Sequence, residues 1–96
     1  MKQLVLNKKD YIFRKMDNVY IALYFSDGNS HMFDDVGTLL IDMIERFPTY
    51  DEALQKSCEY FGENIADFAK EFNIFVEQMK DLNLLIENNI GDSNDN

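Results

Sequence analysis

A chain of 96 residues with 46% hydrophobic and 14% aromatic residues has room for one packed core. Its net charge of −9 argues against nucleic acid and anionic membranes as partners, because an acidic surface repels phosphate groups. The lone cysteine excludes an internal disulfide, and no stretch approaches the roughly 20 apolar residues of a membrane span. Because no apolar signal run follows the first residues, we expect a single cytoplasmic domain.

The charge is unevenly distributed along the chain. The first 18 residues carry a net charge of +3, and the remaining residues carry −12. The cations of this basic N-terminal ribbon are Lys2, Lys8, Lys9, Arg14 and Lys15. Such a ribbon can steer or dock an acidic partner, and a solvated surface without a partner is an equally good interpretation.

Alternation of apolar and polar residues with period two predicts strands over residues 11–16 and 19–25. Asp17-Asn18 between them suits a two-residue hairpin turn, because Asn and Asp tolerate positive φ angles. Asp27-Gly28-Asn29 is a stronger turn signal and leads into a short third strand, Ser30 to Phe33. We expect these strands to form a small antiparallel sheet.

At Asp34-Asp35 the apolar pattern changes to the period of a helix, which continues until Phe47-Pro48. An aspartate suits this start, because a carboxylate accepts hydrogen bonds from the free N–H groups of a first turn. Thr49 and Glu52 form the sequence of a capping box, which predicts a second helix ending at Gly62.

Asn64 can cap a third helix of about 19 residues, the longest predicted element. Three strands followed by three helices predict an α+β domain with the helices on one face of the sheet. We expect residues 1–9 to be a lead-in, residues 10–86 to be the domain, and residues 87–96 to be a disordered polar tail.

The sequence contains little that indicates catalysis. His31 is the only histidine, and we expect Cys58 to be a buried small apolar residue. The Asp34-Asp35 pair is more typical of helix capping than of a metal site or an acid–base pair. No phosphate-binding loop, zinc motif or iron–sulfur cysteine set is present, so we predict no enzyme activity, metal or cofactor.

The third predicted helix has an unusually wide apolar arc. The apolar residues on it are Phe68, Phe72, Phe75, Val76, Met79 and Leu82. One interpretation is that all of them are core, and the other is that some line an apolar groove. A groove beside the free edge of the strand at residues 30–33 would allow a peptide to bind as an added strand.

Three runs of this chain resemble the PqqD-like peptide chaperones, which bind leader peptides of ribosomally made, post-translationally modified peptides. The runs are HMFDDVGTLLIDMI, FPTYDEALQKSCEYFG and EFNIFVEQMKDLNLL. The resemblance covers about residues 10 to 86. Phe33, Asp34 and Asn83 depart from the family's usual Leu, Asn and Gly, in ways that are conservative in shape or in capping and turn chemistry.

The resemblance implies a winged-helix-like fold in which a leader peptide lies against the third strand and above the third helix. It implies a non-catalytic domain that captures a precursor leader and presents it to a separate enzyme, such as a radical-SAM maturase or a leader peptidase with its cyclase. We expect backbone pairing from Ser30, His31, Met32 and Phe33. We expect side-chain pockets from Phe72, Phe75, Val76 and Met79.

Two other functions fit the same pattern. A winged-helix DNA-binding domain has a similar topology, although residues 64–83 carry two lysines against four acidic residues. A small structural or dimerisation subunit would use the apolar residues of the third helix as a protein interface.

Overall fold

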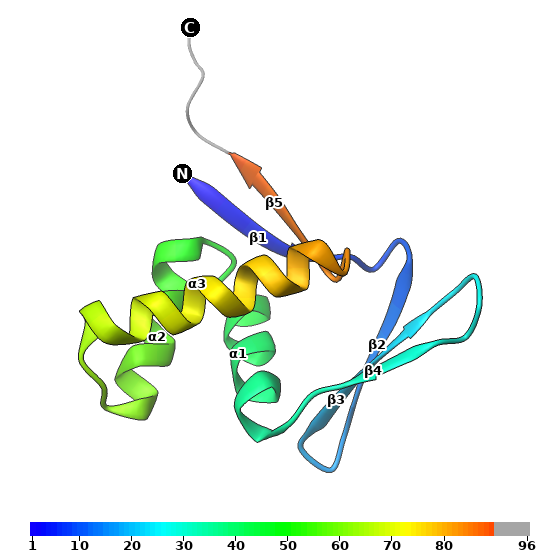
Figure 1. Cartoon of the computed structure of the whole chain (residues 1–96), viewed down its shortest axis with the longest axis horizontal. Coiled ribbons are helices and arrows are strands. Elements are labelled where there is room, and N and C mark those ends of the chain that lie inside the picture. The colour runs from blue at the N-terminus through cyan, green and yellow to red at the C-terminus, as the bar shows by residue number, and fades with distance from the viewer. Residues whose placement is uncertain (90–96) are drawn as a thin grey trace, which may run out of the picture.

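The computed structural model describes residues 1–89, which form two small sheets and three helices (Figure 1). The strands are β1 (Lys2–Leu6), β2 (Tyr11–Met16), β3 (Val19–Tyr24), β4 (Ser30–Met32) and β5 (Leu85–Asn89). The helices are α1 (Asp35–Arg46), α2 (Tyr50–Phe61) and α3 (Ile65–Asp81). The α+β class with a three-stranded antiparallel sheet followed by three helices is confirmed, and a further strand pair accompanies it.

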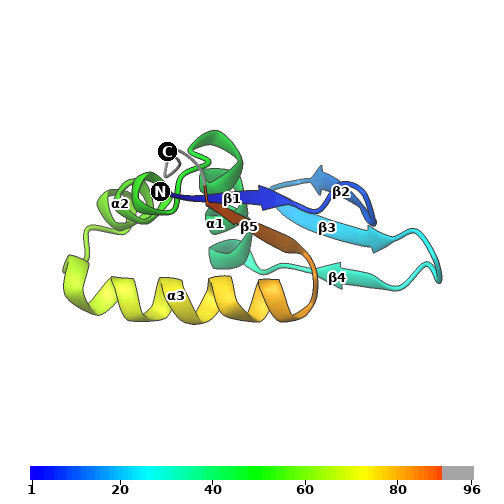
Figure 2. The same cartoon turned by 90° about the horizontal axis from the view of Figure 1, so that it is seen from above.

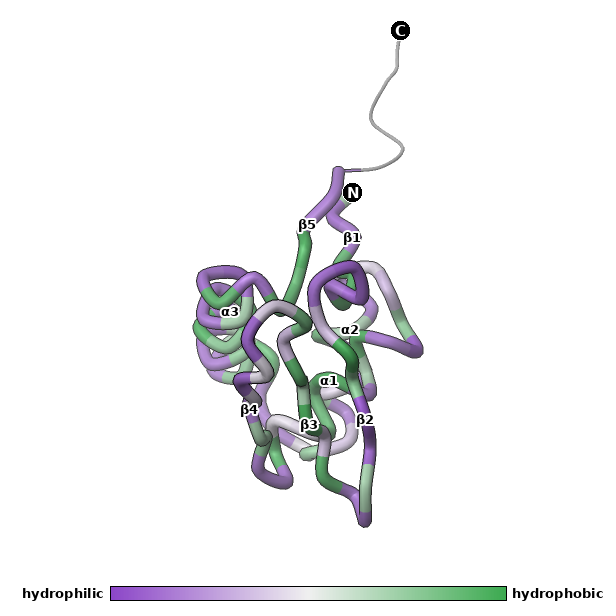
Figure 3. Tube along the Cα trace, turned by 90° about the vertical axis from the view of Figure 1, so that its right-hand side faces the viewer, coloured by the Kyte–Doolittle hydropathy of each residue, from purple (hydrophilic) through white to green (hydrophobic). Residues whose placement is uncertain are grey.

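The three-stranded sheet has the order β2-β3-β4, with both neighbouring pairs antiparallel (Figure 3). Asp17 and Asn18 have φ angles of 49° and 67°, so the predicted hairpin turn with positive φ values is confirmed. Gly28, with φ 74°, makes the second turn. Asp27 supports that turn by accepting a hydrogen bond from the Asn29 N–H at 2.9 Å.

The helix boundaries follow capping chemistry. Asp34 is the N-cap of α1, and its carboxylate accepts from the Gly37 N–H at 2.7 Å, which confirms the capping interpretation. Gly62 ends α2 in the left-handed conformation, with φ 68°. Asn64 caps α3 by accepting from the N–H of the residue two positions later at 2.9 Å.

The predicted capping box at the start of α2 is only partly present. Thr49 is the N-cap, but its hydroxyl donates to the Glu52 carboxylate at 3.3 Å and makes no bond to a backbone N–H. The two side chains therefore bond to each other instead of to the first turn of the helix.

The second sheet consists of β1 and β5, and it corrects the predicted domain boundaries. Residues 2–6 pair with residues 85–89, so the N-terminal segment is part of the fold and not a lead-in. Residues 87–89, predicted as disordered tail, lie in β5, and the rest of that predicted tail lies outside the described residues. Neither strand was predicted, because β1 is only five residues long and β5 ends in Asn-Asn, which disfavours strands.

The buried side chain of Asn7 joins the two ends of the chain. Its amide donates to the Asn83 carbonyl at 2.8 Å, and its backbone N–H donates to the Leu84 carbonyl at 2.9 Å. Asn83 has a φ angle of 60°, a left-handed conformation that asparagine adopts at smaller cost than most other non-glycine residues. These bonds fix the turn between α3 and β5 against the start of β2.

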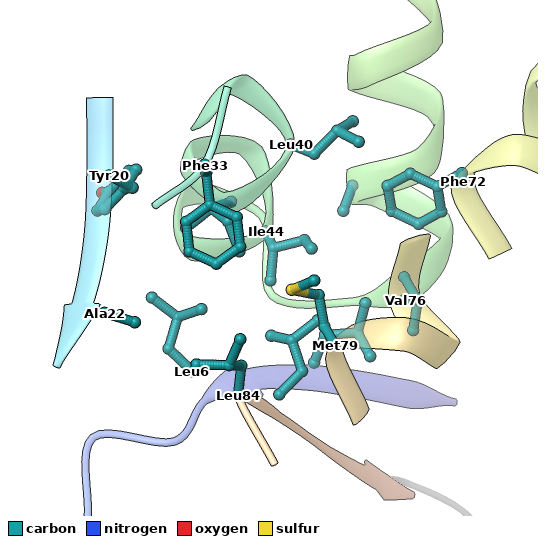
Figure 4. Packing of buried hydrophobic residues seen from close by; sticks show 14 of the residues in the cluster. Leu6, Tyr20, Ala22, Phe33, Leu40, Ile44, Phe72, Val76, Met79 and Leu84 are labelled. Atoms are coloured by element: carbon teal, nitrogen blue, oxygen red, sulfur yellow. The ribbon is translucent and has the colours of Figure 1, made fainter. Parts of the chain in front are cut away.

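One core lies between the helices and the inner face of the three-stranded sheet (Figure 4). It includes residues from both sheets and all three helices, among them Leu4, Ala22, Ile44, Ala53, Phe72 and Leu84. On the opposite face of the sheet, Ile12 and Met32 are exposed, so the helices cover one face only, as predicted. None of the helices within residues 1–89 has the length and apolar character needed to cross a membrane.

Candidate functional site

Within residues 1–89, strand β4 is an edge strand that pairs with β3 on one side only. The Phe33 N–H donates to the Tyr20 carbonyl at 3.0 Å, which fixes the alternation of the ladder. Because backbone groups alternate sides along a strand, His31 directs its N–H and C=O toward β3, whereas Ser30 and Met32 direct theirs toward the free edge. This edge therefore offers two outward N–H groups and two outward C=O groups.

The strand is one residue shorter than predicted, and the side chain of Thr38 explains where it ends. The buried Thr38 hydroxyl accepts from the Tyr20 N–H at 3.0 Å and donates to the Phe33 carbonyl at 3.4 Å. It thus bridges a backbone N–H and a backbone C=O that the ladder would otherwise join directly. The chain leaves the sheet at this bridge and enters α1.

The four side chains predicted on this segment lie in different environments. Phe33 is buried in the core, and His31 is half-buried with its ring 6.1 Å from that of Tyr11. Ser30 is exposed, and Met32 is 74% exposed on the outer face of the sheet. The segment therefore offers backbone groups at its edge, the Met32 side chain on one face and part of the His31 ring on the other.

The helix residues predicted to form pockets belong largely to the core. Phe72 and Val76 are fully buried, and Met79 is 7% exposed, so these side chains pack against the protein and present no open wall. The wide apolar arc arises because α3 packs on both α2 and β5, and β5 was not predicted. Phe75 is the one predicted pocket residue with a half-buried side chain at the rim of the core.

The two flanks of α3 have different surroundings. On one flank, Asn73 accepts from the Tyr50 hydroxyl at 3.0 Å and Lys80 bonds the Glu87 carboxylate at 2.9 Å, so this flank faces α2 and β5. The opposite flank repeats at helical spacing and consists of Asp67, Glu71, Phe75, Gln78 and Leu82. We call it the open flank.

The open flank of α3 adjoins the sheet at its C-terminal end. The Leu82 carbonyl accepts from the Tyr11 hydroxyl at 2.8 Å, and Tyr11 in turn contacts the His31 ring. No Cα of α3 lies within 8 Å of a Cα of β4, although the two elements lie on the same side of the molecule (Figure 2). An added strand would lie about 4.8 Å from β4.

Gln78 and Glu71, on the open flank of α3, were not among the predicted site residues. Their signal is the spacing of four and three residues from Phe75, which places all three on one flank of a helix. The spacing alone does not show that this flank is the open one, because that requires knowing which flank of α3 faces β5.

Two of the five cations of the basic N-terminal ribbon lie at the opposite edge of the three-stranded sheet. Arg14 and Lys15 are on β2, two strands away from the free edge of β4. Lys15 pairs with Asp42 at 3.7 Å, and Lys8 pairs with Glu45 at 2.7 Å, so α1 already supplies acidic partners.

Glu45 is the most perturbed carboxylate of this α1 surface. The hydrogen bond from Lys8 lowers the pKa of Glu45, with a smaller contribution from the Tyr20 hydroxyl at 2.9 Å. Burial, followed by the bond to Glu45, raises the pKa of Tyr20 to about 12. The bond between Tyr20 and Glu45 lies where α1 packs against β3.

The remaining side chains that could react or bind a metal have structural roles. Cys58 is buried, as expected, and its thiol donates to the Glu63 carbonyl at 3.0 Å. Within residues 1–89, no group of three or more His, Cys, Asp or Glu side chains lies close enough to hold a metal ion.

A surface cavity of about 480 Å³ lies between α2 and the start of α3, not at the β4 edge. It is lined by Leu54, Cys58 and Ile65 with a rim that includes Asp51, Glu59 and Glu63. Its lining contains no histidine and no second thiol, and no metal-binding group of side chains is found in the described chain. A strand edge needs no cavity, because strand addition uses main-chain hydrogen bonds.

These elements define a winged-helix-like α+β domain whose wing ends in a free edge strand. The solved structure of TbiB1 in complex with the TbiA(beta) leader peptide has the same fold, with a TM-score of 0.74. The match covers 93% of this chain and 98% of TbiB1 at 15% sequence identity. No protein-family model matches the chain, and no curated protein sequence does.

Proposed function

We propose that this chain is a non-catalytic recognition domain for the leader of a ribosomally synthesised, post-translationally modified precursor peptide. The leader binds as an added strand at β4, and the domain presents the attached core to a separate modifying enzyme, either a radical-SAM maturase or a leader peptidase with its cyclase. The free β4 edge carries this proposal. A shared fold with a protein solved with a leader peptide supports it.

The β4 edge has the properties that strand addition requires. Ser30 and Met32 turn four backbone groups outward, and each new hydrogen bond contributes about 0.5–1.5 kcal/mol net. Neither proline nor lysine protects the strand against pairing. Phe75 and Leu82 on the open flank of α3, together with the His31 ring, offer apolar surface to alternate side chains of the added strand.

The exposed surface of α3 disfavours the DNA-binding alternative. Asp67, Glu71, Glu77 and Asp81 are exposed on this helix. Of its two lysines, Lys80 is already bonded to Glu77 and Glu87. A helix that approaches phosphates needs free cations, and this helix presents carboxylates.

The proposal is tested with Met32→Pro, which removes an outward N–H without removing a bond to β3. A library of randomised 12-residue peptides is displayed against the immobilised wild-type chain, and the dissociation constant of the best binder is then measured. Met32→Pro is expected to weaken binding at least tenfold. Met32→Ala, which keeps the N–H and loses only the exposed side chain, is the control and is expected to stay within about threefold.

Thermal unfolding of both variants checks that the sheet is intact. Equal affinity for Met32→Pro and wild type would contradict strand addition at this edge. If the wild-type chain enriches no peptide from the library, the recognition function itself is wrong.

A further inference from the structure

The free β4 edge is flanked by carboxylates at both ends. Asp27 lies in the turn before the strand, and Asp34 and Asp35 follow it. All three residues are exposed, and within residues 1–89 none of them forms a salt bridge. Any chain that binds along this edge therefore passes negative charge that is not neutralised by the protein.

The open flank of α3 continues the same negative charge. β4 and α3 lie on the same side of the molecule, and the C-terminal end of α3 is the end nearer to β4 (Figure 2). From that end, the open flank carries the apolar Leu82 and Phe75, followed by the carboxylates of Glu71 and Asp67. Glu71 and Asp67 are exposed and make no salt bridge with a described residue.

Lys70 is an exposed cation beside Glu71 on α3, whereas other cations lie farther from the β4 edge. Arg14 and Lys15 lie on β2, separated from the β4 edge by β3, which corresponds to about 10 Å at the usual strand spacing. Lys80 projects from the other flank of α3 and is bonded to Glu87. This distribution does not favour an acidic leader, because Arg14 and Lys15 lie at the β2 edge and the leader would bind at the β4 edge.

From this arrangement we infer that the leader is cationic, an inference that rests on the proposed function. It has Lys or Arg residues next to its apolar strand segment, on the side that passes the start of α1 and the N-terminal half of α3. Apolar residues of the leader contact Phe75 and Leu82, and its cations face Asp35 and Glu71. The strand edge is the site, and the carboxylates set the charge of the peptide that occupies it.

Each exposed ion pair changes affinity by a modest factor, about 1.4- to fivefold, and salt screens it. Two or three such pairs distinguish a basic leader from an acidic one of the same apolar pattern by about tenfold or more. The same field accelerates association of a basic peptide at low salt.

The test uses the same library of randomised 12-residue peptides. Selected sequences are expected to combine alternating apolar residues with Lys or Arg on one side of them. Binding of the best basic peptide is expected to weaken by about two- to fivefold in Glu71→Gln and in Asp35→Asn. Glu77→Gln, which removes the same charge from the opposite flank of α3, is the matched control and should leave the dissociation constant unchanged.

Salt dependence provides a second readout. Raising NaCl from 50 to 300 mM should weaken binding of the basic peptide more in the wild type than in the Asp35→Asn/Glu71→Gln double variant, because salt screens the ion pairs that the double variant lacks. Apolar peptides selected without a preference for cations, or no change in either single variant, would overturn the cationic leader. The proposed function would survive that result as long as Met32→Pro still weakens binding. Binding that is insensitive to Met32→Pro would instead remove the recognition site itself.

Discussion

Val76→Asp is expected to unfold the protein. Val76 is fully buried in the core between α3 and the rest of the domain, so the variant places a carboxylate where it has no water and no cation. A buried unpaired charge costs several kcal/mol, which is comparable to the about 5–15 kcal/mol of total stability that a domain of this size has. The far-ultraviolet circular dichroism of the variant should resemble that of a largely unfolded chain.

Ile74→Asp is the matched control for this experiment. Ile74 lies two residues away on the same helix and is 57% exposed, so its carboxylate stays in water. We expect its urea midpoint to remain close to that of the wild type. A Val76→Asp variant that folds normally and loses only peptide binding would mean that Val76 lines a groove, as the alternative interpretation of the sequence holds.

Leu4→Ala is expected to lower the free energy of unfolding by about 2–5 kcal/mol. Leu4 is 1% exposed and belongs to the core, although it lies in a segment that the sequence suggested was only a lead-in. Truncation of its side chain removes apolar burial and leaves a cavity between β1 and the helices. Urea unfolding monitored by circular dichroism measures the difference.

Val5→Ala tests whether this loss is specific to the inward face of β1. Val5 is the next residue, points to the other side of the strand and is 38% exposed. Its substitution should cost less than about 1 kcal/mol. If both substitutions have equally small effects, β1 does not contribute to the core.

Local chemistry made the wing and the helix boundaries predictable. The Asp17-Asn18 turn, the Asp34 cap and the Gly62 stop each depend on one or two residues whose backbone preferences are strong. The free edge of β4 could also be predicted, because a short strand that ends a meander has one unpaired side.

The N- and C-terminal strands were not predictable in the same way. Pairing between residues 2–6 and 85–89 joins the two ends of the described chain, and neither segment has a strong pattern alone. Without β5, α3 has more apolar residues than the predicted sheet and helices could cover. Phe72 and Val76 were therefore predicted to line a groove. The error in the site therefore follows directly from the missing strand.

The most direct test of the central claim is amide hydrogen exchange of residues 30–33 with and without the selected peptide. Strand addition at β4 predicts that the outward N–H groups of Ser30 and Met32 become protected, by up to about 100-fold at 100 times the dissociation constant. The Phe33 amide, already bonded to the Tyr20 carbonyl, should change far less. Unchanged exchange at Ser30 and Met32, with new protection elsewhere, would contradict strand addition at this edge.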